Sequence, residues 1–257
     1  MSQKPTLVFV PGAGHNASVW DKVTSLMEAQ QYKCVKATLP STTGNPSSSF
    51  KDDIDAIRDI IVAETTQGHD VVVVVHSYGG AVGVSAVKDL TKPKEGNSSP
   101  GHVIGIASMA SAFGPTGTSF TEGMDGKLPQ SWKLDEESGF AVIVAEAQPR
   151  ELFYHDLPEE EGNYWVGRIE PQSLKSFMDP EGGKYYYAGW MDVPVWYLGT
   201  AEDKALPFEV QKMLVGMAKD AGGDFTVREV QSSHSPMLSK PKEVADFLLE
   251  AVAAFVG

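Results

Sequence analysis

The stretch VVVVVHSYGG, residues 71–80, decides the fold of this chain. Its five consecutive valines predict a parallel strand that is buried on both faces and lies near the middle of its sheet. The glycines after Ser77 allow a helix to pack closely behind a sharp turn. The stretch therefore predicts a buried strand, a tight turn that carries Ser77, and a helix that begins behind it.

Strand and helix patterns alternate on both sides of this stretch. Residues 6–10 are typical of a strand that ends at the glycine-bearing loop 11–14, and residues 103–109 are typical of the next strand. Further strands are expected at 34–39, 193–198 and 225–230, and helices at 50–61, at 81–90 and after Pro241. Ser18 with Asp21, and Ser49 with Asp52, have the spacing of capping boxes at two helix starts. The alternation predicts an α/β fold with a doubly wound, mostly parallel sheet.

The alternation breaks between residues 114 and 190, where short mixed segments carry acidic clusters and many aromatic residues. We interpret 114–190 as a helical cap inserted into a core formed by 1–113 and 191–257, all within a single structural domain. The aromatic residues of the insertion favour an apolar or aromatic substrate pocket. They are Trp132, Phe140, Phe153, Tyr154, Trp165, Tyr185, Tyr186, Tyr187 and Trp190.

Composition excludes several classes of function. The 257 residues, 42% hydrophobic and 21% charged, suit one large or two small globular domains. The formal net charge of -13 has the wrong sign for a nucleic-acid or anionic-membrane partner. One cysteine cannot form an internal disulfide or a thiolate metal cluster, so we expect no metal and no cofactor. The N-terminal residues lack a secretory signal, which predicts a cytoplasmic protein; a homodimer is left open.

Ser77 is the candidate nucleophile. The turn resembles the G-x-S-x-G pattern, in which a strained strand-to-helix turn projects a serine hydroxyl into solvent, except that Val75 stands where a small residue is favoured. A serine that only caps an ordinary helix is the alternative. An activated serine also needs a histidine to accept its proton and a carboxylate to fix the imidazole tautomer.

The histidine and the carboxylate are expected at later strand ends. His234 follows the last predicted strand in a loop of small residues, whereas His69 lies at the opposite end of the sheet. His76 is expected to be structural, with its side chain pointing away from the reacting groups. For the carboxylate, the spacing leaves Asp203 and its neighbour Glu202 as alternatives, both after the strand at 193–198.

An oxyanion hole in this architecture takes one amide from the residue after the nucleophile and one from a loop after an early strand. These are the amides of Tyr78 and Ala13, with Gly14 as a close alternative. A nucleotide-binding loop is disfavoured, because Ala17 stands where a third glycine would be needed.

With these residues in place, nearly the whole chain resembles the α/β-hydrolases, and is similar to their plant methylesterase and hydroxynitrile lyase branch and its fungal and bacterial relatives. The resemblance rests on residues 9–20, 75–80, 152–154, 171–173 and 202–211, and on the chain order serine, aspartate, histidine. Pro11 departs from it, since a histidine is usual there. The resemblance places the carboxylate on Asp203 and implies that His15 braces the first loop.

The resemblance implies hydrolysis of a small ester, lactone or thioester through an acyl-enzyme on Ser77. Alternatives are a lyase, cyclase, acyltransferase or isomerase step with the same residues, or a ligand receptor that keeps them. Hydroxynitrile lyases carry a lysine directly after the histidine, whereas Ser235 stands there in this chain, which disfavours cyanide release. The expected partner is a small-molecule substrate.

Overall fold

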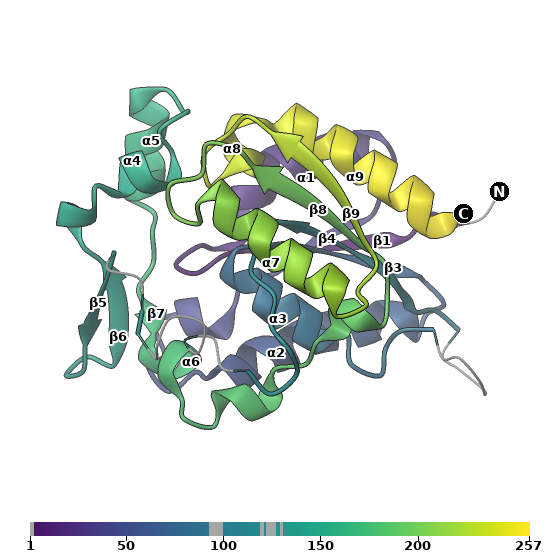
Figure 1. Cartoon of the computed structure of the whole chain (residues 1–257), viewed down its shortest axis with the longest axis horizontal. Coiled ribbons are helices and arrows are strands. Elements are labelled where there is room, and N and C mark those ends of the chain that lie inside the picture. The colour runs from purple at the N-terminus through teal and green to yellow at the C-terminus, as the bar shows by residue number, and fades with distance from the viewer. Residues whose placement is uncertain (1–2, 93–99, 119–120, 122–126, 129–130) are drawn as a thin grey trace.

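The computed structural model describes residues 3–92, 100–118, 121, 127–128 and 131–257 (Figure 1). Six strands form one parallel sheet, which matches the fold class predicted from the sequence. Their order across the sheet is β2 (Cys34–Lys36), β1 (Thr6–Val10), β3 (Val71–His76), β4 (Val103–Met109), β8 (Val195–Thr200) and β9 (Phe225–Val230).

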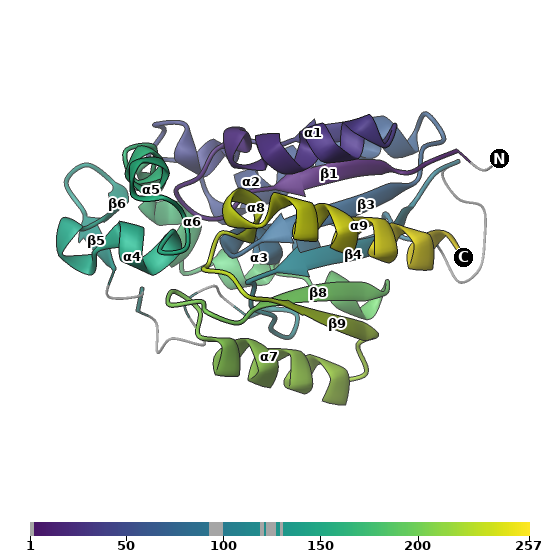
Figure 2. The ribbon, with the colours of Figure 1, turned by 90° about the horizontal axis from the view of Figure 1, so that it is seen from above.

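The valine strand β3 lies between β1 and β4, near the middle of the sheet as predicted. Its side chains alternate between two separate cores, with Val71, Val73 and Val75 on one face and Val72 and Val74 on the other. The first face is covered by α2 (Phe50–Thr65), α3 (Tyr78–Ala86) and α7 (Phe208–Asp220), and the second by α1 (Asp21–Ala29), α8 (Pro236–Ser239) and α9 (Pro241–Val256). In Figure 1 the layer of α1, α8 and α9 lies above the sheet and the layer of α2, α3 and α7 below it, and Figure 2 looks down onto the upper layer. Burial on both faces explains why β3 carries no polar residue before His76.

Of the two capping boxes predicted at helix starts, the structure contains one. At α2 the predicted capping box is present, because the Ser49 hydroxyl accepts from the Asp52 amide and the Asp52 carboxylate accepts from the Ser49 amide. The capping box predicted at Ser18 is wrong. Asn16 accepts from the Ser18 amide instead, and a 3-10 turn at Ala17–Trp20 leads into α1.

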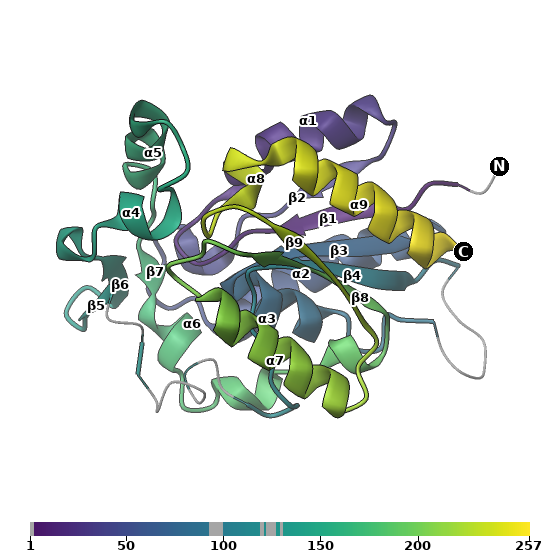
Figure 3. The same ribbon diagram turned by 45° about the horizontal axis from the view of Figure 1, so that its top comes forward.

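The inserted segment holds helices, as predicted, and also a three-stranded antiparallel sheet that the sequence did not predict. Its elements are β5 (Trp132–Asp135), β6 (Phe140–Ile143), α4 (Pro149–Phe153), α5 (Glu159–Val166), β7 (Gln172–Ser173) and α6 (Leu174–Met178). Strands of two to four residues are too short to show an alternating pattern. Figure 3 shows these elements beside one end of the large sheet. The division into a core and a cap at 114–190 stays a prediction.

Helices long and apolar enough to cross a bilayer are not found among the residues described. Most of the polar loop predicted at 92–101 lies outside the described residues.

Candidate active site

Ser77 occupies a strained turn between β3 and α3. Its backbone has φ 51° and ψ -125°, a conformation that residues other than glycine rarely adopt. The Ser77 amide donates to the Met109 carbonyl at 3.2 Å, which ties the turn to the end of β4. The turn leaves the Ser77 side chain in the wall of a cavity rather than in the core.

Gly79 lets the start of α3 lie against the end of β1. A Cβ atom at this position would come within 2.3 Å of the Pro11 carbonyl oxygen, which is backbone and cannot move aside. A residue with a side chain would therefore push α3 away from the 11–14 loop. The close approach brings Tyr78, the first residue of α3, next to the loop that carries Ala13.

Val75 at the first position of the turn motif is accommodated by a glycine in the facing helix. A Cβ atom at Gly83 would lie 2.4 Å from Cγ1 of Val75 and 3.3 Å from Cγ1 of Val73. In the usual motif, a small residue at the position of Val75 leaves room for the helix. Here the room comes from α3, because Gly83 has no side chain. This compensation explains how the strand-to-helix turn forms despite its departure from the usual motif.

We expect Gly83→Ala to lower the free energy of unfolding by about 1–3 kcal/mol, because the new methyl group overpacks the contact with Val75. In a Val75→Ala background the same change should be neutral or stabilising by up to about 1 kcal/mol, since alanine favours a helix over glycine. Urea denaturation of the four proteins measures this coupling. An equal cost of Gly83→Ala in both backgrounds would contradict the compensation.

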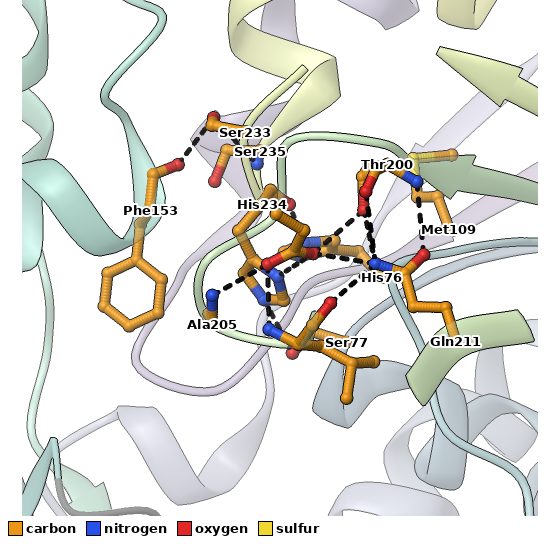
Figure 4. A network of polar contacts seen from close by, with 12 residues as sticks. His76, Ser77, Met109, Phe153, Thr200, Ala205, Gln211, Ser233, His234 and Ser235 are labelled. Carbon is orange, nitrogen blue, oxygen red and sulfur yellow. Dashed lines mark hydrogen bonds and ion pairs between the residues drawn. The ribbon is translucent and has the colours of Figure 1, made fainter. Parts of the chain in front are cut away.

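The structure brings Ser77, His234 and Asp203 together from three separate strand ends. Figure 4 shows the side chains of Ser77 and His234 next to each other. Nε2 of His234 lies 3.0 Å from Oγ of Ser77, and Nδ1 of His234 lies 2.8 Å from Oδ2 of Asp203. The side chains of His234 and Asp203 are 5% and 0% exposed. The imidazole is therefore held between a hydroxyl and a carboxylate, with Nδ1 donating to Asp203 and Nε2 available as a proton acceptor.

The Asp203 carboxylate is surrounded by hydrogen-bond donors. Oδ1 accepts from the amides of Ala205 and Leu206, both at 2.8 Å. Oδ2 accepts from Oγ1 of Thr200 at 2.8 Å and from Nε2 of Gln211 at 3.1 Å, in addition to His234. The neighbouring Glu202 is exposed. The geometry therefore favours Asp203 over Glu202 as the partner of the imidazole.

His76 lies closer to the site than expected. Its Nε2–H donates to the His234 carbonyl at 2.8 Å, and the two rings are 4.8 Å apart, so His76 supports the loop that presents His234. His76 also lines the cavity, and because its ring lies against that of His234, the expectation that its side chain points away from the reacting groups is not met. Burial, together with the nearby His234, lowers the pKa of His76 well below its ordinary value.

The two candidate oxyanion donors in the first loop differ in their partners. The Gly14 amide already donates to Oε1 of Gln172 at 2.9 Å. The Ala13 amide, by contrast, meets no hydrogen-bond acceptor among the residues described. Of the two amides, only that of Ala13 is therefore available to a ligand without breaking an existing bond.

Ser77 and His234 border a cavity of about 340 Å³ whose other walls are mainly apolar. The insertion, the first loop of the sheet and α7 all contribute to it. No described residue in the wall carries a Lys, Arg, Asp or Glu side chain. Arg150 and Arg168, the two arginines of the insertion, lie outside the wall, and Arg168 is exposed. Apolar side chains from the insertion and α7 are Leu128, Trp132, Phe153, Phe177, Tyr186, Val210, Met213 and Leu214.

His15 braces the first loop in its neutral form. Burial lowers its pKa from 6.5 to about 4. Its Nδ1–H donates to the Ala13 carbonyl at 2.7 Å, and its Nε2 accepts from the Tyr154 hydroxyl at 2.5 Å. Protonation of His15 would put a hydrogen on Nε2, which now accepts from the Tyr154 hydroxyl, and would place a positive charge in a buried site. The neutral imidazole is therefore favoured in the folded protein.

The unfolded chain binds a proton at His15 below about pH 6.5, whereas the folded protein does not until about pH 4. The free energy of unfolding should therefore fall as the pH drops through this range. Between pH 7 and 4.5, we expect a His15→Gln variant to lose about 2–3 kcal/mol less than the wild type. Urea denaturation at both pH values tests this. The expectation fails if both proteins lose the same stability.

Sequence reasoning missed several residues of this region, among them Asp53, Thr200 and Gln172. Gln172 entered only as part of the stretch 171–173 that carries the resemblance, with no role assigned, whereas Asp53 left a signal in the pattern of its own helix. It lies between Phe50 and Ile57 at helical spacing, so a carboxylate falls on the face of α2 that the apolar residues predict to be buried. A charged residue at such a position indicates a specific partner.

The sequence pattern of the Alpha/beta hydrolase family matches residues 7–247. The chain belongs to this family. Among its relatives, alpha/beta hydrolase nvfD of Aspergillus novofumigatus is 28% identical over 249 residues, which cover 96% of each chain. Norfluorocurarine synthase 2 of Strychnos nux-vomica is 28% identical, covering 97% of this chain and 96% of the relative.

Plant methylesterases are also similar to this chain. Methylesterase 18 of Arabidopsis thaliana is 23% identical, covering 96% of this chain and 97% of the relative. The crystal structure of polyneuridine aldehyde esterase has a TM-score of 0.77 at 22% identity, covering 97% of this chain and 99% of that chain. The predicted similarity to α/β-hydrolases of the methylesterase type is confirmed, and the structural match shows the shared fold.

Proposed function

We propose that this protein is a serine hydrolase that cleaves small uncharged carboxylic esters through an acyl-enzyme. The observation that carries the proposal is the hydrogen-bonded series Ser77, His234 and Asp203, with contacts of 3.0 and 2.8 Å, in the wall of an apolar cavity. Membership in the Alpha/beta hydrolase family and similarity to proteins named methylesterase support it.

In the acylation step, Oγ of Ser77 attacks the ester carbonyl carbon while Nε2 of His234 accepts the hydroxyl proton. Asp203 holds the imidazole in the tautomer with a proton on Nδ1 and stabilises the positive charge that forms on the ring. The four other donors to this carboxylate keep it in place at that moment. His234 then donates the proton to the leaving alkoxide, and the alcohol departs.

The negative charge that develops on the carbonyl oxygen is proposed to be stabilised by the amides of Ala13 and Tyr78. Tyr78 is the first residue of α3, so its amide belongs to the positive end of that helix. Donors that are fixed before the reaction need no reorganisation when the charge appears. Water, deprotonated by His234, then attacks the acyl-enzyme and releases the carboxylic acid and free Ser77.

An uncharged substrate is proposed because no Lys, Arg, Asp or Glu side chain is found among the described residues of the cavity wall. A carboxylate buried against apolar side chains without a counter-charge is strongly disfavoured. The aromatic side chains of the insertion suit an apolar or aromatic acyl group. The volume of about 340 Å³ limits the substrate to a small molecule.

The test is a panel of activated esters and lactones whose acyl groups vary in size and charge. We expect p-nitrophenyl esters with a neutral acyl chain to be hydrolysed with a kcat/KM at least about 100-fold above that of a hemisuccinate of similar size, a difference of about 3 kcal/mol. Equal rates for the two, or a preference for the anionic ester, would contradict the substrate class. If no compound of the panel were hydrolysed, the proposal that this protein is a hydrolase would be contradicted.

A carbon–carbon bond-cleaving step is less well supported. Such chemistry benefits from a cation that stabilises the departing anion, and the resemblance puts a lysine after the histidine in hydroxynitrile lyases. Ser235 occupies that position; it is buried, and its hydroxyl meets no hydrogen-bond partner among the described residues. Among the described residues of the cavity wall, no Lys or Arg takes the place of that lysine. We therefore favour ester hydrolysis.

A further inference from the structure

A buried carboxylate lies beneath the site and takes no part in the proposed chemistry. Asp53, in the first turn of α2, is fully buried. Its Oδ1 accepts from the Ser41 amide at 2.9 Å, and its Oδ2 accepts from the Ser41 hydroxyl at 2.6 Å and from the Tyr78 hydroxyl at 2.8 Å. Desolvation raises its pKa to about 6 despite these three donors. Burying a carboxylate costs free energy of folding, so we expect its contacts to have a specific role.

The contacts continue from Ser41 into the inserted segment. Nε2 of Gln172, in β7, donates to Oγ of Ser41 at 2.6 Å and to Oγ of Ser176 at 2.9 Å. Oε1 of Gln172 accepts from the Gly14 amide at 2.9 Å. The direction of each bond is fixed, because Gly14 can only donate at this point and Ser41 already gives its own hydrogen to Asp53.

These hydrogen bonds form a relay that joins Tyr78, Asp53, Ser41, Gln172 and Gly14. One end reaches a proposed oxyanion donor, and the other reaches the residue that follows the second proposed donor. At one end Asp53 holds the side chain of Tyr78, whose amide is one proposed donor. At the other end Gln172 holds the Gly14 amide, which belongs to the peptide directly after Ala13. The carbonyl of that same peptide accepts from His15. The peptide is therefore fixed at its N–H and at its C=O.

Residues of the insertion hold the Ala13–Gly14 peptide directly at its N–H and, through His15, indirectly at its C=O. Tyr154 donates to His15, and Gln172 contacts Gly14 directly. The Gly14 carbonyl also accepts from the Glu170 amide at 2.8 Å. Gly14 has φ +67°, a left-handed conformation that glycine adopts easily, and it needs these contacts to stay in one orientation.

We propose that Gln172 and Asp53 are positioning residues that set the geometry of the oxyanion hole, and that the insertion thereby aligns the reaction as well as enclosing the substrate. The inference rests on the proposed function. Oxyanion donors act only when they lie within hydrogen-bond reach of the developing charge, so a shift of the Ala13 amide by about 1 Å lowers the rate strongly. Gln172 prevents that shift by giving the next amide along the chain a fixed acceptor.

Gln172→Met tests the inference, with Ser41→Ala as a milder break in the same relay. Ser173→Ala is the matched control. Ser173 is the neighbouring residue of β7, is equally buried and also ties the insertion to the rest of the chain, through its bond to the Pro46 carbonyl at 2.8 Å, but it does not contact Gly14. The probes are the best p-nitrophenyl ester of the panel, the trifluoromethyl ketone of the same acyl chain, and the matching methyl ketone.

The trifluoromethyl ketone separates alignment of the hole from general damage to the pocket. Ser77 adds to its carbonyl carbon, His234 takes the hydroxyl proton, and the carbonyl oxygen becomes an oxyanion in the hole. The methyl ketone occupies the same cavity without forming that charge. A defect in the oxyanion hole weakens only the first compound, whereas a collapsed pocket weakens both.

We expect Gln172→Met to lower kcat by about 10- to 100-fold with KM within about threefold, since a misplaced donor costs less than a missing one. Affinity for the trifluoromethyl ketone should fall by a similar factor, and affinity for the methyl ketone should stay within about twofold. Ser41→Ala should show the same pattern at about 3- to 10-fold, and Ser173→Ala should match the wild type.

Three results would overturn the inference. Gln172→Met and Ser41→Ala could both keep the wild-type kcat. They could weaken the two ketones equally, which would mean a purely structural role. Ser173→Ala could reproduce the whole pattern, which would mean that any loose contact of the insertion suffices. A wild-type protein that neither hydrolyses the esters nor binds the trifluoromethyl ketone would instead contradict the proposed function itself, and the inference with it.

Discussion

Ser77→Ala is expected to lower kcat for the best ester of the panel by about 10⁴- to 10⁶-fold while leaving its KM within a few-fold, because the nucleophile is lost and the cavity is kept. The remaining rate would come from water attack assisted by the oxyanion donors. Steady-state kinetics on protein free of contaminating esterase measures the loss.

The matched control is Ser108→Ala. Ser108 lies in β4 beside Val75 and is fully buried, and its hydroxyl has no hydrogen-bond partner in the part of the chain that the structure describes. This variant should keep wild-type kcat and KM, and the thermal midpoints of both variants should stay close to that of the wild type. A Ser77→Ala protein that hydrolyses the ester at the wild-type rate would show that Ser77 is not the nucleophile.

Asp203→Asn carries the second largest expected effect, a loss of about 10⁴-fold in kcat. An asparagine NH₂ facing Nδ1 of His234 favours the tautomer with its proton on Nε2, and that nitrogen can then no longer accept the Ser77 proton. The amide also cannot accept from all the donors that Ala205, Leu206, Thr200 and Gln211 direct at this carboxylate.

Glu202→Gln is the control for Asp203→Asn, because it removes the adjacent carboxylate, the alternative that chain spacing left open. The Glu202 side chain is exposed, and its carbonyl, which accepts from His155, is unchanged by the substitution. We expect kcat within about twofold of the wild type. If Glu202→Gln lost as much activity as Asp203→Asn, the assignment of the acid would be wrong.

The sheet and the strand-end residues could be predicted because local patterns determine them. Five valines in succession indicate burial on both faces, and each strand that ends in a glycine-rich or small-residue loop delivers its side chains to the same edge of a parallel sheet. That rule was sufficient to select Ser77, His234 and a carboxylate at 202 or 203. It could not choose between Ala13 and Gly14, since the distinction depends on which amide a distant side chain occupies.

The contacts that the sequence did not reveal join residues far apart in the chain. Gln172 and Gly14 are separated by 158 positions. Nothing in the residues around Gln172 indicates that its side chain accepts from a loop near the N-terminus. The same holds for Val75 and Gly83, where a departure from a motif is balanced in the facing helix. Such pairings become visible only once the packing is known, because each residue alone has an ordinary local environment.

The most direct test of the central claim is labelling with a fluorophosphonate, followed by peptide mapping by mass spectrometry. An activated serine displaces fluoride and forms a stable phosphonyl ester. We predict one adduct per chain, located on Ser77, formed slowly in Asp203→Asn and absent in Ser77→Ala. No adduct, or an adduct on another serine that persists in Ser77→Ala, would contradict the account.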